Sequence, residues 1–313
     1  MIPRLILLIV LVEILIILSL GIRVVKQKES SKPSIYEIKK SDIIFPKISS
    51  YKYFYEPRPN TIEISNLAKY GWPDYNSKIS INKSGFNQLK DNSINKQSGV
   101  YRIIAIGDSF TYGPYVNTQD NYPSQLEKLL NDGLANGSLR CKNINKFEVI
   151  NLGETGYDFS YTIERYRLRG QKYNPDLVLW FIIQDDFKRN IEWFYKNKLP
   201  PNPDVKDQLV KNVGGIDNML KLQENIMNTF NKLYKGPLLV FTFSNHLTGE
   251  KQMKTLEHYV KNRKNTYFFN EIPDIFGGTD LSIPEGHPSA KGYNGIAKSL
   301  VGYLSNKIIP CNK

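Results

Sequence analysis

From residue 100 onward, the chain alternates short apolar runs with segments whose apolar residues follow a helical spacing. The apolar runs, rich in β-branched and aromatic residues, predict buried strands. They lie at Tyr101–Ile106, Phe147–Asn151, Asp176–Ile183, Leu238–Phe243 and Thr266–Phe269. The predicted helices lie at Asn121–Leu134, Tyr161–Tyr173, Gln208–Leu233 (with patchy spacing), Lys251–Lys264 and Ser289–Ile308. This alternation is typical of an α/β domain whose parallel sheet is covered by helices on both faces.

The N-terminal segment has a different pattern. Leu5–Ile22 is apolar except for Glu13, Ser19 and Gly21, and it approaches the roughly 20 residues needed to span the hydrocarbon of a bilayer. Its many Leu, Ile and Val residues offset the cost of burying one carboxylate. We therefore predict an N-terminal transmembrane helix that anchors the protein through residues 1–25. A cleaved signal peptide and a soluble core helix are the alternatives.

Between the anchor and the α/β domain the chain has no clean period. Residues 26–47 are rich in lysine and serine, which is typical of a linker, and residues 51–99 are rich in aromatic residues and proline. We predict an irregular extension with short strands. The predicted domains are therefore a membrane anchor at 1–25, a linker and extension at 26–99, and a catalytic domain at 100–313.

Composition adds little to this picture. Hydrophobic residues make up 41% of the chain, enough for a core, and the formal net charge is +12. The basic residues are scattered and no nucleic-acid-binding motif accompanies them, so we expect no nucleic-acid partner. We interpret the positive charge as a solvated surface that favours contact with an anionic membrane or glycan.

Chemically distinctive residues follow the predicted strands at their carboxyl ends, where the active sites of parallel sheets lie. Gly107-Asp108-Ser109 follows the first strand, Asn151–Gly156 the second and Gln184–Asp186 the third. The chain approaches His287 after the fifth. A serine on a tight strand-to-helix turn is expected to hold its hydroxyl exposed to solvent, near backbone N–H groups that face an oxyanion.

His287 is the best candidate for a general base. His246 and His258 lie in polar contexts typical of surface residues, whereas His287 lies in a Gly-His-Pro sequence just before the last predicted helix, which Ser289 can cap. A serine hydroxyl is a weak nucleophile near pH 7 and needs such a base. The sequence therefore predicts that Ser109 and His287 act together.

The order and spacing of four short motifs resemble those of the SGNH/GDSL hydrolase superfamily, from residue 100 to the C-terminus. The motifs are Gly107-Asp108-Ser109, Asn151-Leu152-Gly153-Glu154-Thr155-Gly156, Gln184-Asp185 and His287-Pro288. The resemblance implies a flavodoxin-like, three-layer α/β/α fold with a five-stranded parallel sheet. It also implies ester hydrolysis or acyl transfer. By motif match, Ser109 is the nucleophile, His287 is the base, and the amides of Ser109, Gly156 and Gln184 form the oxyanion hole.

Two positions depart from the family pattern. Gln184 stands where the family has asparagine, and Pro284 stands three residues before His287, where the family has the triad acid. Glu285 can replace that acid and orient the imidazole. Asp280 is a weaker candidate, and a Ser–His dyad is the third possibility.

The neighbouring aspartates have other roles in this interpretation. Asp108 is expected to brace the turn rather than react. Asp185 and Asp186 have no further metal ligands near them in sequence, so we expect no metal and no cofactor.

These observations predict a serine esterase or O-acyl hydrolase that acts on a small acyl ester, as found on a glycan or lipid. An O-acyltransferase that uses the same Ser109 and a non-catalytic SGNH-like binding module are the alternatives. The resemblance favours an extracytoplasmic catalytic domain, whereas the basic residues after the apolar segment, from Arg23 to Lys32, favour a cytoplasmic one.

The two cysteines bear on this conflict. In a flavodoxin-like sheet, the first and last helices lie on the same face and run in the same direction. Cys141 follows the first helix and Cys311 follows the last, so both are expected at the same end of one face. A disulfide is one interpretation and two unrelated thiols are the other. Only an oxidising compartment would preserve the bond.

Overall fold

The computed structural model describes residues 42–67, 76–200, 202–244, 248–272, 274–275 and 280–312. The predicted membrane anchor at residues 1–25 lies outside the described residues. Within the described part of the chain, no helix is both long and apolar enough to cross a membrane. The predicted division at residues 25 and 99 stays a prediction.

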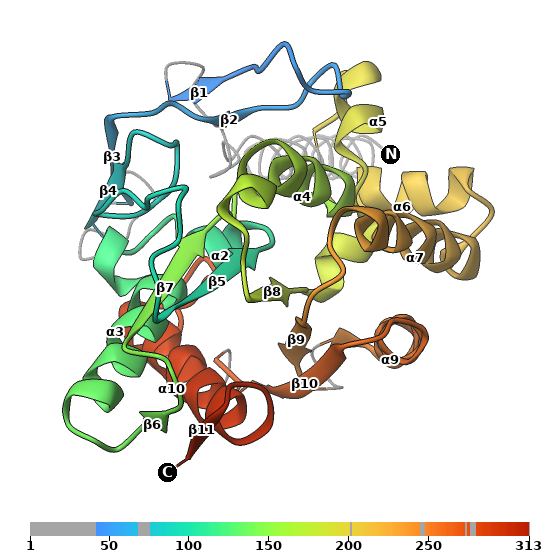
Figure 1. Ribbon diagram of the computed structural model, residues 1–313. Coiled ribbons are helices and arrows are strands. Elements are labelled where there is room, and N and C mark those ends of the chain that lie inside the picture. Colours follow the sequence, from blue (N-terminus) through green and yellow to red (C-terminus); the bar gives the residue numbers. More distant parts are fainter. Residues whose placement is uncertain are drawn as a thin grey trace, which may run out of the picture. The chain divides into compact units, whose positions relative to one another are not determined.

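Five parallel strands form the central sheet in the order β10-β9-β8-β5-β7 (Figure 1). They are β5 (Val100–Ile106), β7 (Lys146–Asn151), β8 (Leu177–Phe181), β9 (Leu238–Phe243) and β10 (Thr266–Ile272). Counted along the chain from the β7 edge, this order is 2-1-3-4-5, which is the flavodoxin-like arrangement. The predicted α/β class and all five strands are confirmed, with β8 shorter and β10 longer than predicted.

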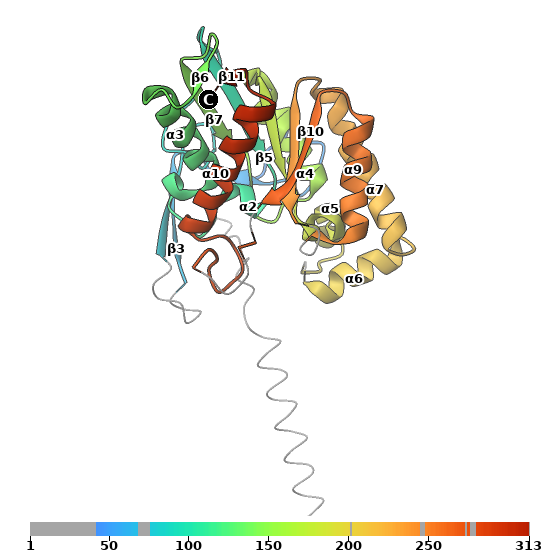
Figure 2. The ribbon, with the colours of Figure 1, turned by 90° about the horizontal axis from the view of Figure 1, so that it is seen from below.

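Helices cover both faces of the sheet, as Figure 2 shows. The helical segments are α2 (Ser109–Tyr112), η2 (Thr118–Asp120), α3 (Tyr122–Ala135), α4 (Phe159–Arg165), η3 (Tyr166–Gly170), η4 (Gln171–Tyr173), η5 (Gln184–Lys188), α5 (Ile191–Lys196), α6 (Pro203–Asn212), α7 (Ile216–Leu233), α9 (Glu250–Asn262) and α10 (Ala290–Lys307). The buried side chains of α3 and α10 share a core with Ile103 and Ala105 of β5. Those of α4, α7 and α9 share a core with Ile104 and Ile106. Successive side chains of β5 therefore pack into the cores on opposite faces of the sheet.

Two predicted helices differ from the observed ones. The segment Gln208–Leu233 is divided between α6 and α7, because Gly214 and Gly215 both adopt positive φ angles, 85° and 107°, that end a right-handed helix. Helix α6 also begins at Pro203, inside a region whose prolines predict a loop, because the Asn202 side chain caps it. In the other segment, Tyr161–Tyr173, α4 ends at Arg165 and continues as the short turns η3 and η4.

The described part of the extension contains the short strands that the sequence predicts. Strand β1 (Ile43–Ile44) pairs antiparallel with β2 (Glu56–Pro57), and β3 (Thr61–Asn66) pairs antiparallel with β4 (Asn76–Ile81). Neither pair joins the central sheet. The extension must therefore be held to the α/β domain by side chains.

Buried charged groups supply much of that attachment. Arg169 donates to the carboxylate of Glu56 in β2, from Nε at 3.0 Å and from Nη2 at 2.7 Å. Arg165 Nη1 lies 3.6 Å from Glu56 Oε1 and 3.9 Å from Glu154 Oε2. Glu56, Glu154 and Arg165 are all buried. Since an unpaired charge is costly inside a protein, removing Glu56 would leave the buried Arg165 without its nearest carboxylate.

Two carboxyl groups near this contact hold their protons unusually tightly. Burial raises the pKa of Glu154 to about 8, although Arg165 opposes the shift. Burial likewise raises the pKa of Glu63 to about 7, although Glu63 accepts a hydrogen bond from the Tyr112 hydroxyl at 2.7 Å. Tyr112 belongs to α2 and Glu154 follows β7, so both carboxyl groups lie beside segments that carry predicted site residues.

The two cysteines form a disulfide. Strands β6 (Arg140–Cys141) and β11 (Cys311–Asn312) pair antiparallel with Cys141 opposite Cys311, and the Cα atoms are 3.9 Å apart. The bond joins the ends of α3 and α10, which pack against each other on one face of the sheet. The prediction from topology is confirmed, across 170 positions of sequence.

Removing the disulfide should destabilise the fold without changing the site. We expect Cys141→Ser/Cys311→Ser to lower the free energy of unfolding by roughly 4 kcal/mol, because the unfolded chain regains the entropy of a long loop. Denaturant unfolding of the parent, with and without reductant, and of the double variant measures this. Equal midpoints for the reduced and oxidised parent would show that the bond does not stabilise the protein.

Glu154 should make stability depend on pH. Its folded pKa is raised, so between about pH 4.5 and pH 8 the folded state holds a proton that the unfolded chain has lost. The free energy of unfolding should therefore fall as pH rises through this window. We expect Glu154→Gln to remove part of that fall, on the order of 2 kcal/mol. Thermal unfolding from pH 5 to pH 8 tests this, with Glu257→Gln, an exposed position, as the control. Parallel profiles for the parent and Glu154→Gln would contradict it.

Candidate active site

Three neighbouring strands present the predicted site motifs at one edge of the sheet. Strand β5 leads into Gly107-Asp108-Ser109, β7 into the loop that ends at Gly156, and β8 into Gln184. Because β7, β5 and β8 are adjacent and parallel, their carboxyl ends meet at the same edge (Figure 1). The loop before α10 brings His287 to this edge from the far end of the sequence.

The turn at Ser109 depends on its two preceding residues. Gly107 has a φ of 148°, and a side chain there would lie 2.5 Å from Thr111 Oγ1 and 2.8 Å from the Phe181 carbonyl oxygen. Asp108 caps α2, since its Oδ1 accepts from the backbone N–H of Phe110 at 2.9 Å. Ser109 is therefore the first residue of α2, three positions after the end of β5.

A chain of hydrogen bonds joins Ser109, His287 and Glu285. The Oγ of Ser109 lies 2.7 Å from Nε2 of His287, and Nδ1 of His287 lies 2.5 Å from Oε2 of Glu285. The rings of Phe110 and Tyr115 flank the imidazole, with centroids at 4.8 and 5.2 Å. In this geometry Ser109 can donate its proton to Nε2 while Nδ1–H donates to the carboxylate.

A tight turn explains how an acid two residues before the histidine reaches it. The backbone N–H of Ile283 donates to the carbonyl of His287 at 2.9 Å, and that of Gly286 donates to the carbonyl of Ile283 at 2.9 Å. Gly286 adopts a φ of 107°, which favours glycine. The reversal at Gly286 brings the Glu285 carboxylate next to the imidazole, so the acid need not stand at Pro284.

Asp280, the other candidate acid, lies elsewhere. Its Oδ2 accepts from Lys291 Nζ at 2.6 Å, and its side chain is 68% exposed. The Asp280 carbonyl accepts a hydrogen bond from the Ser289 hydroxyl. The Ser289 Oγ in turn accepts from the backbone N–H of Gly292, so Ser289 caps α10 as predicted. The structure thus places Glu285, and not Asp280, beside His287.

One expectation about the serine is wrong. The Ser109 hydroxyl was expected to face solvent, but Ser109 is only 2% exposed and His287 only 3%. The reason is long-range packing, because the loop before α10 lies over the turn and places His287 directly on Ser109 Oγ. Such burial strengthens the hydrogen bonds of the chain by excluding water.

The structure describes the surroundings of the three residues predicted to form the oxyanion hole. The N–H groups of Ser109 and Gly156 have no hydrogen-bond acceptor among the described residues, and Gly156 adopts a φ of 79°. Gln184 begins η5 and is exposed, and its Nε2 lies 3.2 Å from where a side-chain carbon on Gly249 would be. The role of Gln184 in an oxyanion hole stays a prediction, as do the catalytic roles of the other residues.

Arg189 is a positioning residue that the sequence analysis missed. Its Nη1 donates to Asp108 Oδ2 at 3.0 Å and to the carbonyl of Tyr157 at 3.2 Å, while its Nη2 donates to Asp185 at 2.5 Å. The guanidinium thus ties together the loops that follow β5, β7 and β8. The spacing of Asp185 and Arg189, four positions apart on a short helical turn, was the available signal.

Asp185 and Asp186 are engaged by this cluster. Burial alone would raise the pKa of Asp185, but the neighbouring charges of Arg189 and Lys206 lower it. Lys206 Nζ lies 2.6 Å from the Asp185 carboxylate. Burial and the neighbouring Asp108 raise the pKa of Asp186. Among the described residues, no group of three or more metal-ligating side chains is assembled for a metal ion. The two aspartates therefore belong to an ion-pair network.

The other two histidines do not enter the site. His258 is exposed and contacts Glu224 on the neighbouring helix α7, as expected of a surface residue. His246 lies outside the described residues.

Comparison with known proteins finds similar solved structures but no family model and no curated protein that matches. TesA is 14% identical, with a TM-score of 0.39, and the match covers 66% of this chain and 98% of TesA. A two-domain esterase (CEX) active on acetylated mannans is 13% identical, with a TM-score of 0.46, and the match covers 66% of this chain and 49% of that esterase. A putative lipolytic protein of the G-D-S-L family from Desulfitobacterium hafniense DCB-2 is 18% identical, with a TM-score of 0.35, and the match covers 63% of this chain and 95% of that protein.

At identities below 20% and TM-scores below 0.5, a function has to be inferred from the chemistry of Ser109, His287 and Glu285. By motif order, sheet topology and the contacts of those three side chains, the chain resembles an SGNH/GDSL hydrolase.

Proposed function

We propose that this protein is a serine esterase of the SGNH/GDSL kind. The observation that carries the proposal is the continuous hydrogen-bonded chain from Ser109 through His287 to Glu285. A nucleophile, a base in contact with it and a third group that orients the base are the requirements for nucleophilic acyl transfer.

In the proposed reaction, Ser109 Oγ attacks the ester carbonyl while Nε2 of His287 takes the hydroxyl proton. Glu285 holds the imidazole in the correct tautomer and stabilises the imidazolium. The N–H groups of Ser109 and Gly156 stabilise the developing oxyanion. His287 then gives its proton to the leaving alcohol, and water, activated by the same imidazole, hydrolyses the acyl-enzyme. An acceptor hydroxyl in place of water would make the product a new ester.

We infer a small acyl group on a glycan or lipid alcohol as the substrate. Support comes from the near-complete burial of Ser109 and from the rings of Phe110 and Tyr115 beside His287. A group that reaches the buried Ser109 hydroxyl has to pass these side chains, which favours a small acyl group. Water or a sugar hydroxyl accepts the acyl group, depending on which of them binds beside the acyl-enzyme.

We also propose an extracytoplasmic location for the catalytic domain. The Cys141–Cys311 disulfide supports it, since such bonds persist in oxidising compartments. The lysines and arginine after the N-terminal apolar segment oppose it. Membrane attachment through residues 1–25 is part of this proposal.

Loss of the nucleophile should abolish esterase activity. We expect Ser109→Ala to lower kcat by at least roughly 10³-fold, because the triad members act as a unit. A panel of esters of graded acyl length, measured with and without a glycan acceptor, tests the substrate class and the acceptor together. Ser138→Ala, at an exposed position, is the control. Covalent labelling of the parent but not of Ser109→Ala by a fluorophosphonate would support the assignment. Activity above about a tenth of the parent would refute it.

Loss of the acid should slow turnover with little effect on substrate binding. We expect Glu285→Gln to lower kcat roughly 10³-fold and to leave KM nearly unchanged, because the carboxylate stabilises charge only as the imidazolium forms. Asp280→Asn, which removes an exposed carboxylate in the same loop, should retain the parental kcat. Parental turnover in Glu285→Gln would instead indicate a Ser–His dyad.

A further inference from the structure

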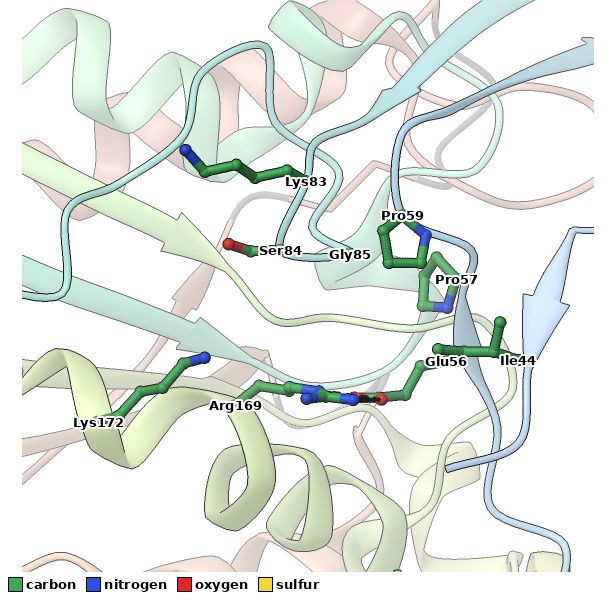
Figure 3. Close-up of a pocket in the computed structure, with 9 residues that line it drawn as sticks. All are labelled: Ile44, Glu56, Pro57, Pro59, Lys83, Ser84, Gly85, Arg169 and Lys172. Atoms are coloured by element: carbon green, nitrogen blue, oxygen red, sulfur yellow. Dashed lines mark hydrogen bonds and ion pairs between the residues drawn. The ribbon is translucent and has the colours of Figure 1, made fainter. Parts of the chain in front are cut away.

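A cavity of about 180 Å³ lies between the N-terminal extension and the segment after α4 (Figure 3). The turn after β4, residues 83–85, forms one wall, and Glu56, Arg169 and Lys172 lie opposite it in this view. None of these residues belongs to the Ser109–His287–Glu285 chain. The cavity is smaller than the roughly 300 Å³ at which pockets begin to hold a whole drug-sized ligand. It therefore suits one chemical group of a larger molecule.

The lining carries more positive than negative charge. Lys83, Arg169 and Lys172 are among its lining residues, and the only carboxylate in that lining is Glu56. Glu56 is 3% exposed and already neutralised, since Arg169 donates to both of its oxygens and Arg165 lies 3.6 Å away. Glu56 therefore does not oppose the two lysine charges of the lining.

The two lysines are free to move toward a ligand. Lys83 Nζ lies 3.4 Å from Asp91, but its side chain is 66% exposed, and exposed pairs of this kind contribute only about 0–1 kcal/mol. Lys172 Nζ lies 5.5 Å from the ring centre of Tyr173. Redirecting either amine costs little.

A hydroxyl pair supplies neutral hydrogen-bonding groups. Ser84 Oγ lies 3.1 Å from the hydroxyl of Tyr173, and Ser84 lies between Lys83 and the opposite wall in Figure 3. One of these hydroxyls can donate to the other and the second can donate to a bound oxygen. A ligand oxygen in the cavity would thus meet a hydroxyl as well as two ammonium groups.

We propose that this cavity binds a phosphoryl group. A carboxylate is recognised best by the two-pronged edge of an arginine, but Glu56 already occupies that edge of Arg169. What remains are two ammonium point charges and a hydroxyl, on opposite walls, which suit the several oxygens of a tetrahedral anion. The phosphoryl group can belong to a soluble phosphorylated sugar or to a lipid headgroup. The proposal does not depend on the esterase function.

Binding to the full-length protein at constant ionic strength tests the proposal. The soluble probes are inorganic phosphate and glucose 6-phosphate, with acetate and glucuronate as carboxylate controls, measured by calorimetry. The lipid probe is vesicles with and without phosphatidic acid, measured by co-sedimentation. The test variant is Lys83→Ala/Lys172→Ala. The matched control is Lys211→Ala/Lys261→Ala, which removes the same charge at exposed positions on α6 and α9.

We expect the test variant to weaken phosphate-ester binding by about tenfold or more and the control to weaken it by no more than about twofold. Binding of the soluble probes or of phosphatidic acid vesicles, with this dependence, supports the site and identifies the source of its ligand. Equal weakening in both double variants, carboxylates that bind as tightly as phosphates, or no binding of any phosphate probe would overturn it. Unfolding midpoints of both variants verify that they fold.

Discussion

The hydrogen bond between Ser109 and His287 joins residues 178 positions apart, and much of the fold serves to make it possible. Ser109 is fixed by the end of β5 and the start of α2, while His287 is fixed by the turn before α10. The two segments meet because α3 and α10 pack side by side on one face of the sheet. The imidazole is thus placed by the packing of a whole layer of helices.

Charge burial organises the neighbourhood of that bond. Arg189 holds the loops after β5, β7 and β8 in one arrangement by pairing with Asp108, Asp185 and Asp186. Arg165 does the same on the other side, between Glu56 of the extension and Glu154 of the β7 loop. Because each arginine has several acidic partners, each loop position depends on the others. The extension is therefore part of the structural support of the candidate site.

The sequence was informative where burial is continuous and local. The run Leu238–Phe243 was predicted with its observed bounds, because every residue in it is buried. The helix break at Gly214 and Gly215 and the start of α6 at Pro203 depend on single backbone angles and one cap, which weak periodicity hides. At the site, motif spacing predicted Ser109 and His287 as a pair, whereas Glu285 departs from the family spacing and was one of three possibilities for the third member. The burial of Ser109 and the partners of Arg189 could not be predicted, because they arise from contacts between distant segments.

The Cys141–Cys311 bond makes most of the α/β domain a covalently closed ring. His287 and the strands β7 to β10 lie within the ring, whereas Ser109 lies in the part of the chain that precedes Cys141. A single cleavage of the backbone anywhere between the two cysteines would therefore leave one molecule, with nucleophile and base still connected through the sulfur bridge. The disulfide would therefore give the domain a tolerance to such nicks that hydrogen bonds and packing alone would not guarantee.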